Sequence, residues 1–254
     1  MLCKKIIIKI DLLCNFLYCA KLSMIFEQLF DTKSSTYTYI ISSGKGREAL
    51  IIDPVIESTD KYIKILKNLD LRLVKVIDTH IHADHISGLN ELSKRTKCSK
   101  IMGEESSSEV LDIRVKDNEK IKIENIDLIS MYTPGHTNCS YSFLMNDRVF
   151  TGDTLLINST GRTDFQSGSS YDAYDSLFNK LLKLPEKTLV FPAHDYKGKK
   201  YSTIETEKNN NPRLQVSSPE EYAEIMNNLS LEAPKMIGIA VPANVKGFTL
   251  NQAN

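Results

Sequence analysis

The chain has 254 residues, and its 32 basic and 32 acidic side chains cancel. This length suits one large domain with a real core and is too short for two. Because the chain has no net charge and no dense basic stripe, its composition argues against a nucleic-acid-binding surface.

Residues 1–23 differ in composition from the rest, with lysines around two apolar patches. Lys9 and Asp11 interrupt the apolar run and leave it too short for a membrane span. We interpret residues 1–23 as an extension that folding does not need, either a targeting segment or sequence upstream of a natural start at Met24. Residues 24–254 then form one domain.

The cysteines favour a reducing compartment, because their number is odd and no pair has CxxC spacing. The predicted location is therefore cytoplasmic, with organelle targeting by residues 1–23 as the alternative. We expect Cys139, three residues after His136, to be a small buried thiol. The cysteines are Cys3, Cys14, Cys19, Cys98 and Cys139.

The first half of the domain alternates strand-like and helix-like stretches. Two short strands over residues 37–42 and 49–53 flank a Ser-Gly-Lys-Gly hairpin turn. A helix over residues 59–69 follows, with apolar residues at helical spacing behind a Ser58 or Thr59 cap. The other elements predicted here are a strand over 74–77, a helix over 86–95 and a strand over 100–102.

The second half is richer in strands. Residues 141–145 and 148–151 form a predicted hairpin across an Asn-Asp turn, and residues 173–182 form a long amphipathic helix. Because hairpin signals are too frequent for a purely parallel sheet, we predict an α+β fold in which two sheets pack face to face under helices, an αββα sandwich. The other predicted elements are strands over 120–123, 127–132 and 189–191, and a helix over 218–229.

All five histidines fall within three short motifs, THIHADH, PGH and PAHD, and a TGD segment adds a carboxylate. Histidine is the commonest neutral nitrogen donor to metals in proteins, so this concentration predicts a metal centre assembled from four chain segments. The candidate ligands are His80, His82, Asp84, His85, His136, Asp153 and His194.

Each of these motifs follows an apolar, strand-like stretch. Side chains delivered from the ends of several strands converge on one rim, where sheet-based enzymes usually build their sites. Within the first motif we expect His80 and His82 to face one point, and Asp84 and His85 a neighbouring one. A lone Gly-Asp or Gly-His would be explained by a turn, but beside the first motif we interpret both as ligand-bearing.

This combination of motifs resembles the metallo-β-lactamase superfamily, whose fold is the αββα sandwich. Within that superfamily the closer likeness is to the persulfide dioxygenases and spans residues 26–244. One departure is that members often read PGHTPG, whereas Thr137, Asn138 and Cys139 follow His136 here. The likeness rests on FTGDTLLINSTGRTDFQSGS (150–169), FPAHDYKG (191–198), NPRL (211–214) and AVPAN (240–244).

The resemblance implies one Fe(II) per chain, with His80, His136 and Asp153 on one face of the ion. It implies that glutathione persulfide and O2 react there to give sulfite and glutathione. No nucleic acid and no membrane span are expected, and a homodimer is the assembly considered. Outside the iron shell the resemblance places His82, Asp84, His85 and His194, and against glutathione it places Arg162, Tyr196 and Arg213.

Two alternatives stay open. A glyoxalase II-type hydroxyacylglutathione hydrolase would hold two zinc ions, or mixed zinc and iron, by adding Asp84, His85 and His194 with Asp153 as a bridge. The GRTDF run and the short region after Asn211 favour the dioxygenase. A non-catalytic metal- or thiol-binding relative is disfavoured because no ligand is missing. For single residues, Arg162 could pair with Asp164, and Tyr196 could simply pack.

Overall fold

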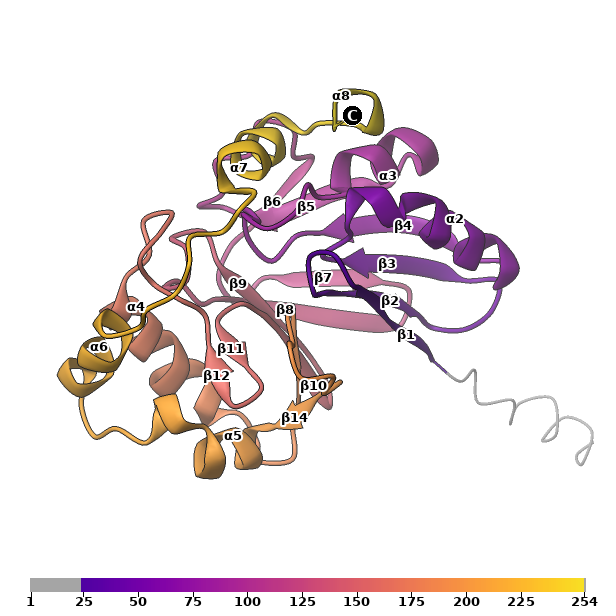
Figure 1. Ribbon diagram of the computed structural model, residues 1–254. Coiled ribbons are helices and arrows are strands. Elements are labelled where there is room, and N and C mark those ends of the chain that lie inside the picture. Colours follow the sequence, from indigo (N-terminus) through magenta and orange to yellow (C-terminus); the bar gives the residue numbers. More distant parts are fainter. Residues whose placement is uncertain (1–23, 254) are drawn as a thin grey trace, which may run out of the picture.

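The computed structural model describes residues 24–253, which form two back-to-back sheets between two layers of helices (Figure 1). This arrangement is the predicted αββα sandwich. The interpretation of residues 1–23 lies outside the described residues, as do the first three cysteines. Within residues 24–253, none of the helices combines the length and the apolar character that crossing a membrane requires.

The first sheet contains six strands in sequence order. Its first three strands pair antiparallel through hairpins, and β3 to β6 run parallel. The helices α2 and α3 carry the chain back from β3 to β4 and from β4 to β5, and a loop leads from β5 to β6. The elements are β1 (Ile25–Asp31), β2 (Thr36–Ser42), β3 (Glu48–Ile52), α2 (Thr59–Asn68), β4 (Arg72–Ile77), α3 (Leu89–Thr96), β5 (Ser99–Gly103) and β6 (Ile113–Val115).

The second sheet has the order β14-β13-β10-β9-β8-β7 and is antiparallel except where β10 pairs with β13. Its strands are β7 (Lys120–Ile123), β8 (Ile126–Tyr132), β9 (Tyr141–Met145), β10 (Arg148–Gly152), β13 (Leu189–Pro192) and β14 (Ser202–Thr203), and a separate ribbon joins β11 (Leu155–Leu156) to β12 (Ser159–Thr160). The helices beside it are α4 (Ser170–Asp175), α5 (Ile204–Asn210) and α6 (Pro219–Asn227).

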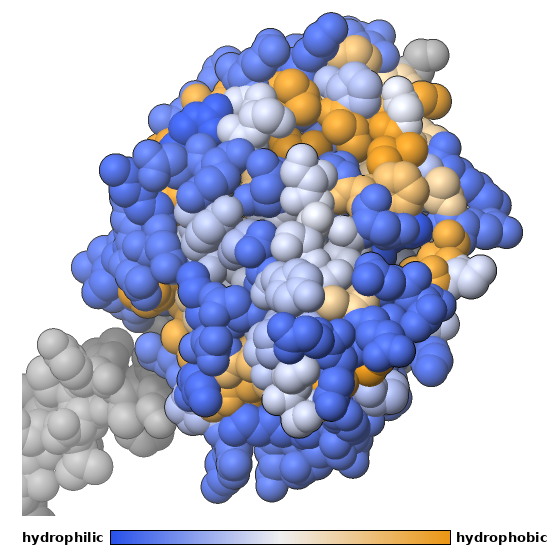
Figure 2. All heavy atoms as spheres, turned by 90° about the vertical axis from the view of Figure 1, so that its left-hand side faces the viewer, coloured by the Kyte–Doolittle hydropathy of each residue, from blue (hydrophilic) through white to orange (hydrophobic). Residues whose placement is uncertain are grey.

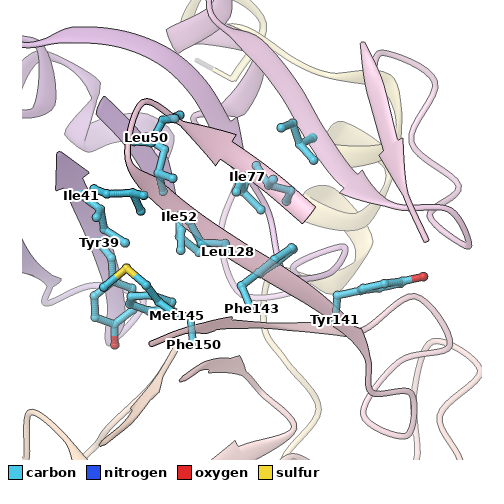
Figure 3. Packing of buried hydrophobic residues seen from close by; sticks show 14 of the residues in the cluster. Tyr39, Ile41, Leu50, Ile52, Ile77, Leu128, Tyr141, Phe143, Met145 and Phe150 are labelled. Carbon is cyan, nitrogen blue, oxygen red and sulfur yellow. The ribbon is translucent and has the colours of Figure 1, made fainter. Parts of the chain in front are cut away.

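The main core lies between the sheets (Figure 3). Side chains alternate along a strand, so on β2 Tyr39 and Ile41 enter this core while Ile40 packs on the other face with the helices. From the second sheet, Phe143 and Phe150 meet them, both at most 1% exposed. Burial of these large side chains holds the two sheets together and fixes the ends of their strands relative to each other.

Two helix predictions need correction. The residues expected to begin a helix at 86 instead lie beside residues 54–56, with hydrogen bonds from Gly88 N to Pro54 O and from Ile56 N to Ile86 O, so α3 begins only at Leu89. The helix expected over residues 173–182 begins earlier, because the Ser169 side chain caps α4. It then changes to a π-helical turn over Ser176–Lys180.

Several helices and strands of the structure have no counterpart among the predicted elements. These are β1, β6, β11, β12, β14, α5, and the C-terminal helices α7 (Ile237–Lys246) and α8 (Leu250–Ala253). Several are too short to show a period, and α7 has apolar residues around most of its circumference, so no stripe marks its buried face. Cys139 is buried, as expected.

Candidate metal centre

The four motifs meet at one edge of the sandwich. The THIHADH loop follows β4, His136 follows β8, Asp153 follows β10, and His194 follows β13. Each side chain therefore leaves the end of a strand that the core holds in place. The expectation that the motifs converge on one rim is confirmed.

His80, His136 and Asp153 form a set in which one donor atom from each lies within 4.8 Å of the others. Burial, together with the neighbouring His82 and His136 rings, holds the pKa of His80 well below its usual value, so its imidazole is neutral and keeps a lone pair. Asp153 Oδ1 is buried and has no hydrogen-bond partner among the described residues. Two imidazoles and a carboxylate with an unpartnered oxygen fit a divalent transition-metal ion.

Hydrogen bonds orient both imidazoles. His136 Nδ1 lies 2.8 Å from the Arg162 carbonyl oxygen, an acceptor, so Nδ1 carries the proton and Nε2 is left for a metal. Nδ1 of His80 lies 3.0 Å from the Thr79 hydroxyl, which donates to Asp53 Oδ2 at 3.0 Å. The Arg162 carbonyl thus orients His136, and the Thr79 hydroxyl, held by Asp53, orients His80.

His82 does not face the same point as His80, so this part of the sequence prediction is wrong. Its Nε2 lies 3.2 Å from Asp53 Oδ1 in a fully buried pair. Burial alone would lower the pKa of His82, but Asp53 outweighs it and raises that pKa to about 10. The buried carboxylate thus engages Nε2 of His82. Nδ1 is buried without a hydrogen-bond partner among the described residues, and His82 belongs to a separate set with Asp84 and His85.

Asp78 lies beside this pair, 4% exposed, and burial raises its pKa to about 7. Because this value lies above the ordinary 3.8 of the unfolded chain, Asp78's contribution to stability is complete below about pH 4 and is lost as pH rises through about 7. The side chain introduced by Asp78→Asn stays neutral at every pH. We therefore expect the free energy of unfolding of the metal-free variant, relative to wild type, to be higher at pH 8 than at pH 5. Urea unfolding midpoints at both pH values measure this, and an equal difference at both would contradict it.

Comparisons with known proteins point in the same direction as this geometry. The family model of the metallo-beta-lactamase superfamily matches residues 31–130 and 110–194. The chain belongs to the metallo-β-lactamase superfamily.

Individual relatives refine the position within the superfamily. The chain is 40% identical over 226 residues, 88% of each chain, to the mouse protein named persulfide dioxygenase ETHE1, mitochondrial. It is 30% identical over 187 residues, 68% of each chain, to a hydroxyacylglutathione hydrolase of Dictyostelium discoideum. The crystal structure of ETHE1 from Myxococcus xanthus superimposes with a TM-score of 0.85 at 45% identity, covering 87% of this chain and 98% of that one.

The residues that could hold a second metal of the superfamily type are present but engaged with one another. Asp84 Oδ2 lies 2.9 Å from His85 Nδ1, 3.2 Å from the Thr36 hydroxyl and 3.5 Å from His194 Nε2. Among residues 24–253, Asp84, His85 and His194 do not form a set whose donor atoms all lie within 4.8 Å. Asp84 and His85 form such a set with His82 instead, next to the set of His80, His136 and Asp153.

A cavity of about 440 Å³ opens onto His136 and Asp153, and all three predicted glutathione contacts line it. Tyr196 is 75% exposed and lies parallel to the His194 ring at 6.0 Å, so its hydroxyl is free for a ligand. The Arg213 guanidinium donates to the Thr160 carbonyl oxygen. Whether these residues contact substrate stays a prediction.

Arg162 is engaged as the alternative interpretation expected. Its guanidinium makes two 2.7 Å hydrogen bonds to Asp164 and one of 2.6 Å to the Glu232 carbonyl oxygen. The same residue's own carbonyl orients His136. Arg162 therefore links the loop behind the candidate ligand His136 to the C-terminal segment that lines the cavity.

Sequence reasoning missed several supporting residues. Asp53 receives hydrogen bonds from the Thr79 backbone N–H at 2.7 Å and from the Thr79 hydroxyl. The Gln166 side chain donates to the Ile81 carbonyl oxygen at 2.8 Å, next to His80. Asp53 could have been suspected as a carboxylate at a strand end before Pro54, whereas Gln166 carries no local signal.

We expect Arg162→Gln to weaken metal binding, because the loop that orients His136 loses its bidentate pair and its bond to Glu232. The expected increase in the zinc dissociation constant is about 10-fold, the lower range for an outer contact. Competition with a chromophoric chelator measures it. Arg148→Gln is the matched control, since Arg148 makes the same fork to Asp147 at 2.8 Å in a distant turn; equal losses would contradict the link.

Proposed function

We propose that this chain is a persulfide dioxygenase that oxidises glutathione persulfide with O2 to sulfite and glutathione. One Fe(II) per chain would be held by His80, His136 and Asp153. The observation that carries the proposal is this set of two imidazoles and one carboxylate, on a chain 40% identical to a curated persulfide dioxygenase over 88% of both lengths. The cytoplasmic location and the homodimer stay predictions from the sequence.

Bound iron in a two-histidine, one-carboxylate site supplies open coordination positions and redox chemistry for O2. Glutathione persulfide, O2 and water give glutathione, sulfite and two protons, so the outer sulfur is oxidised and O2 reduced. The chain's own residues bind the thiol, orient it and manage protons. Among the described residues no thiol is available to the reaction, since the buried Cys98 and Cys139 do not line the cavity.

Binding of the peptide part falls to the cavity's exposed polar groups. The Arg213 guanidinium and the Tyr196 hydroxyl can hold the carboxylates of glutathione while the persulfide sulfur points toward Asp153. The surrounding burial excludes water, because His80, His82 and His194 are at most 3% exposed. Exclusion of water strengthens the electrostatic contacts inside the site.

His194 is placed to hold a proton. Its Nδ1 donates to the Ser35 carbonyl oxygen at 3.0 Å, and its Nε2 lies 3.7 Å from Asp153 Oδ1. Burial by itself would lower the pKa of His194, but Asp153 and Asp84 outweigh it and raise it. A proton at Nε2 can therefore be given to the departing glutathione thiolate.

The second candidate is a hydroxyacylglutathione hydrolase, favoured by the complete set of second-metal residues and the Dictyostelium relative. The test compares two preparations, one loaded anaerobically with Fe(II) and one with zinc. We expect the iron protein to consume O2 with glutathione persulfide, and the zinc protein to hydrolyse S-lactoylglutathione no faster than an Asp153→Ala control. Efficient thioester hydrolysis without O2 consumption would replace the dioxygenase with the hydrolase.

A further inference from the structure

A side chain from the C-terminal helix reaches the metal-binding loop. Asn244, on α7, donates from Nδ2 to the carbonyl oxygens of His82 and His85 at 2.9 and 3.0 Å, and its Oδ1 accepts from the Ser87 backbone N–H at 2.8 Å. The side-chain amide thus uses both its donors and its acceptor on one loop, 157 to 162 residues away in the chain.

The loop depends on these bonds. Among the described residues, the His82 and His85 carbonyl oxygens accept from no other donor. Both residues are at most 4% exposed, so water cannot take the place of the amide. A buried carbonyl without a partner is costly, and the loop would move to satisfy it.

The packing of α7 brings Asn244 to this position. Ala240 and Ala243, on the same face of the helix, are fully buried against Ile56 and Ile86, and their small side chains let the backbone come close. Ile239, at the edge of this face, is 59% exposed. In Figure 2, apolar side chains gather in the upper part of the view, at the height where Figure 1 shows α7.

The Asn244 bonds complete a clamp on the loop between the ligand His80 and Ser87. Gln166 fixes the Ile81 carbonyl oxygen, and Asn244 fixes the carbonyls of His82 and His85. We propose that Asn244 is a positioning residue of the metal centre, which sets the path of this loop and with it the place of His80 and Asp84. The C-terminal helix would then be part of the metal site although it contributes no ligand.

The proposal rests on the metal site of the proposed function, but not on the oxidation of persulfide. Its test is cobalt(II) affinity of the full chain, measured by competition with a chelator, together with the cobalt absorption spectrum. Asn244→Asp is the informative variant. The aspartate has nearly the same shape and still accepts from the Ser87 N–H. It cannot donate to the two carbonyl oxygens, and its negative oxygen repels them.

We expect Asn244→Asp to raise the cobalt dissociation constant by about 10- to 100-fold and to change the spectrum. Asn90→Ala is the matched control, because the Asn90 amide donates to the Gly247 carbonyl oxygen and so fastens the same C-terminal segment without touching the loop. It should bind cobalt within about 3-fold of wild type at a comparable loss of thermal stability. Asn244→Ser, which keeps one short donor, replaces Asn244→Asp if the latter does not fold.

A folded Asn244 variant with wild-type cobalt affinity and spectrum would overturn the proposal. So would equal losses in Asn90→Ala, since the effect would then come from general destabilisation. Because cobalt binding needs neither persulfide nor O2, the result does not depend on whether the chain proves to be a dioxygenase.

Discussion

Asp153→Asn is expected to lose O2 consumption with glutathione persulfide by more than about 1,000-fold, well beyond the ~10- to 100-fold cost of an outer contact. Asp153 is the only carboxylate in the set with His80 and His136, and its Oδ2 lies 3.5 Å from His136 Nε2. An amide cannot supply the negative oxygen that a divalent ion prefers. Oxygen-electrode rates and iron analysis of the same preparation measure both losses.

Asp84→Asn is the matched comparison, since both carboxylates lie near His194 but only Asp153 belongs to the ligand set. We expect it to keep one metal per chain and to lose activity by about 10- to 100-fold, as for an outer contact. If Asp84→Asn and Asp153→Asn lost metal and activity equally, the site would have to use both carboxylates as ligands. That result would favour two metals.

Gly152→Ala is expected to destabilise the metal-free chain by about 3 kcal/mol, from a left-handed backbone and a forced contact together. Gly152 has φ +51°, and a Cβ built there would lie 2.6 Å from Thr79 Oγ1. That hydroxyl bonds both Asp53 and His80 Nδ1, so it cannot move without disturbing a ligand. Metal affinity should therefore fall with stability. Urea unfolding and chelator competition measure the two effects.

Gly198→Ala measures the cost of a left-handed backbone angle alone, without a new side-chain contact. Gly198 also has a left-handed φ, +78°, but a Cβ there would meet nothing within 4 Å. We expect it to cost only about 1 kcal/mol and to leave metal binding unchanged. Equal effects at positions 152 and 198 would show that the contact with Thr79 has no importance.

The sandwich and the convergence of the candidate ligands could be predicted because their signals are local, whereas the choice of His80, His136 and Asp153 among them came from the family resemblance. Apolar runs mark the strands, and each ligand follows the end of a run, so convergence on one rim needs only the general behaviour of sheets. Reliance on local signals also explains why the helix prediction over residues 173–182 was wrong. The π-helical turn over Ser176–Lys180 keeps Leu177 and Leu181 buried and leaves no trace in the spacing that predicted a single helix.

The orientation of His82 and the clamp by Asn244 could not have been predicted in this way. His82 turns toward Asp53, 29 positions earlier, and Asn244 lies 162 positions after His82. The first contact exists only once β3 and β4 lie side by side, and the second only once the last helix has packed on the loop. Arg162 shows the opposite case, because its pairing with Asp164 is local and could be stated from the sequence as an alternative.

The most direct test of the metal centre is a stoichiometry measured on anaerobically purified chain reconstituted with Fe(II). Bound iron is counted, O2 is consumed with glutathione persulfide, and sulfite is determined in the same sample. We predict one iron per chain and one O2 consumed for each sulfite formed. A chain that retains only redox-inert metal and consumes no O2 when given persulfide would contradict the proposed function.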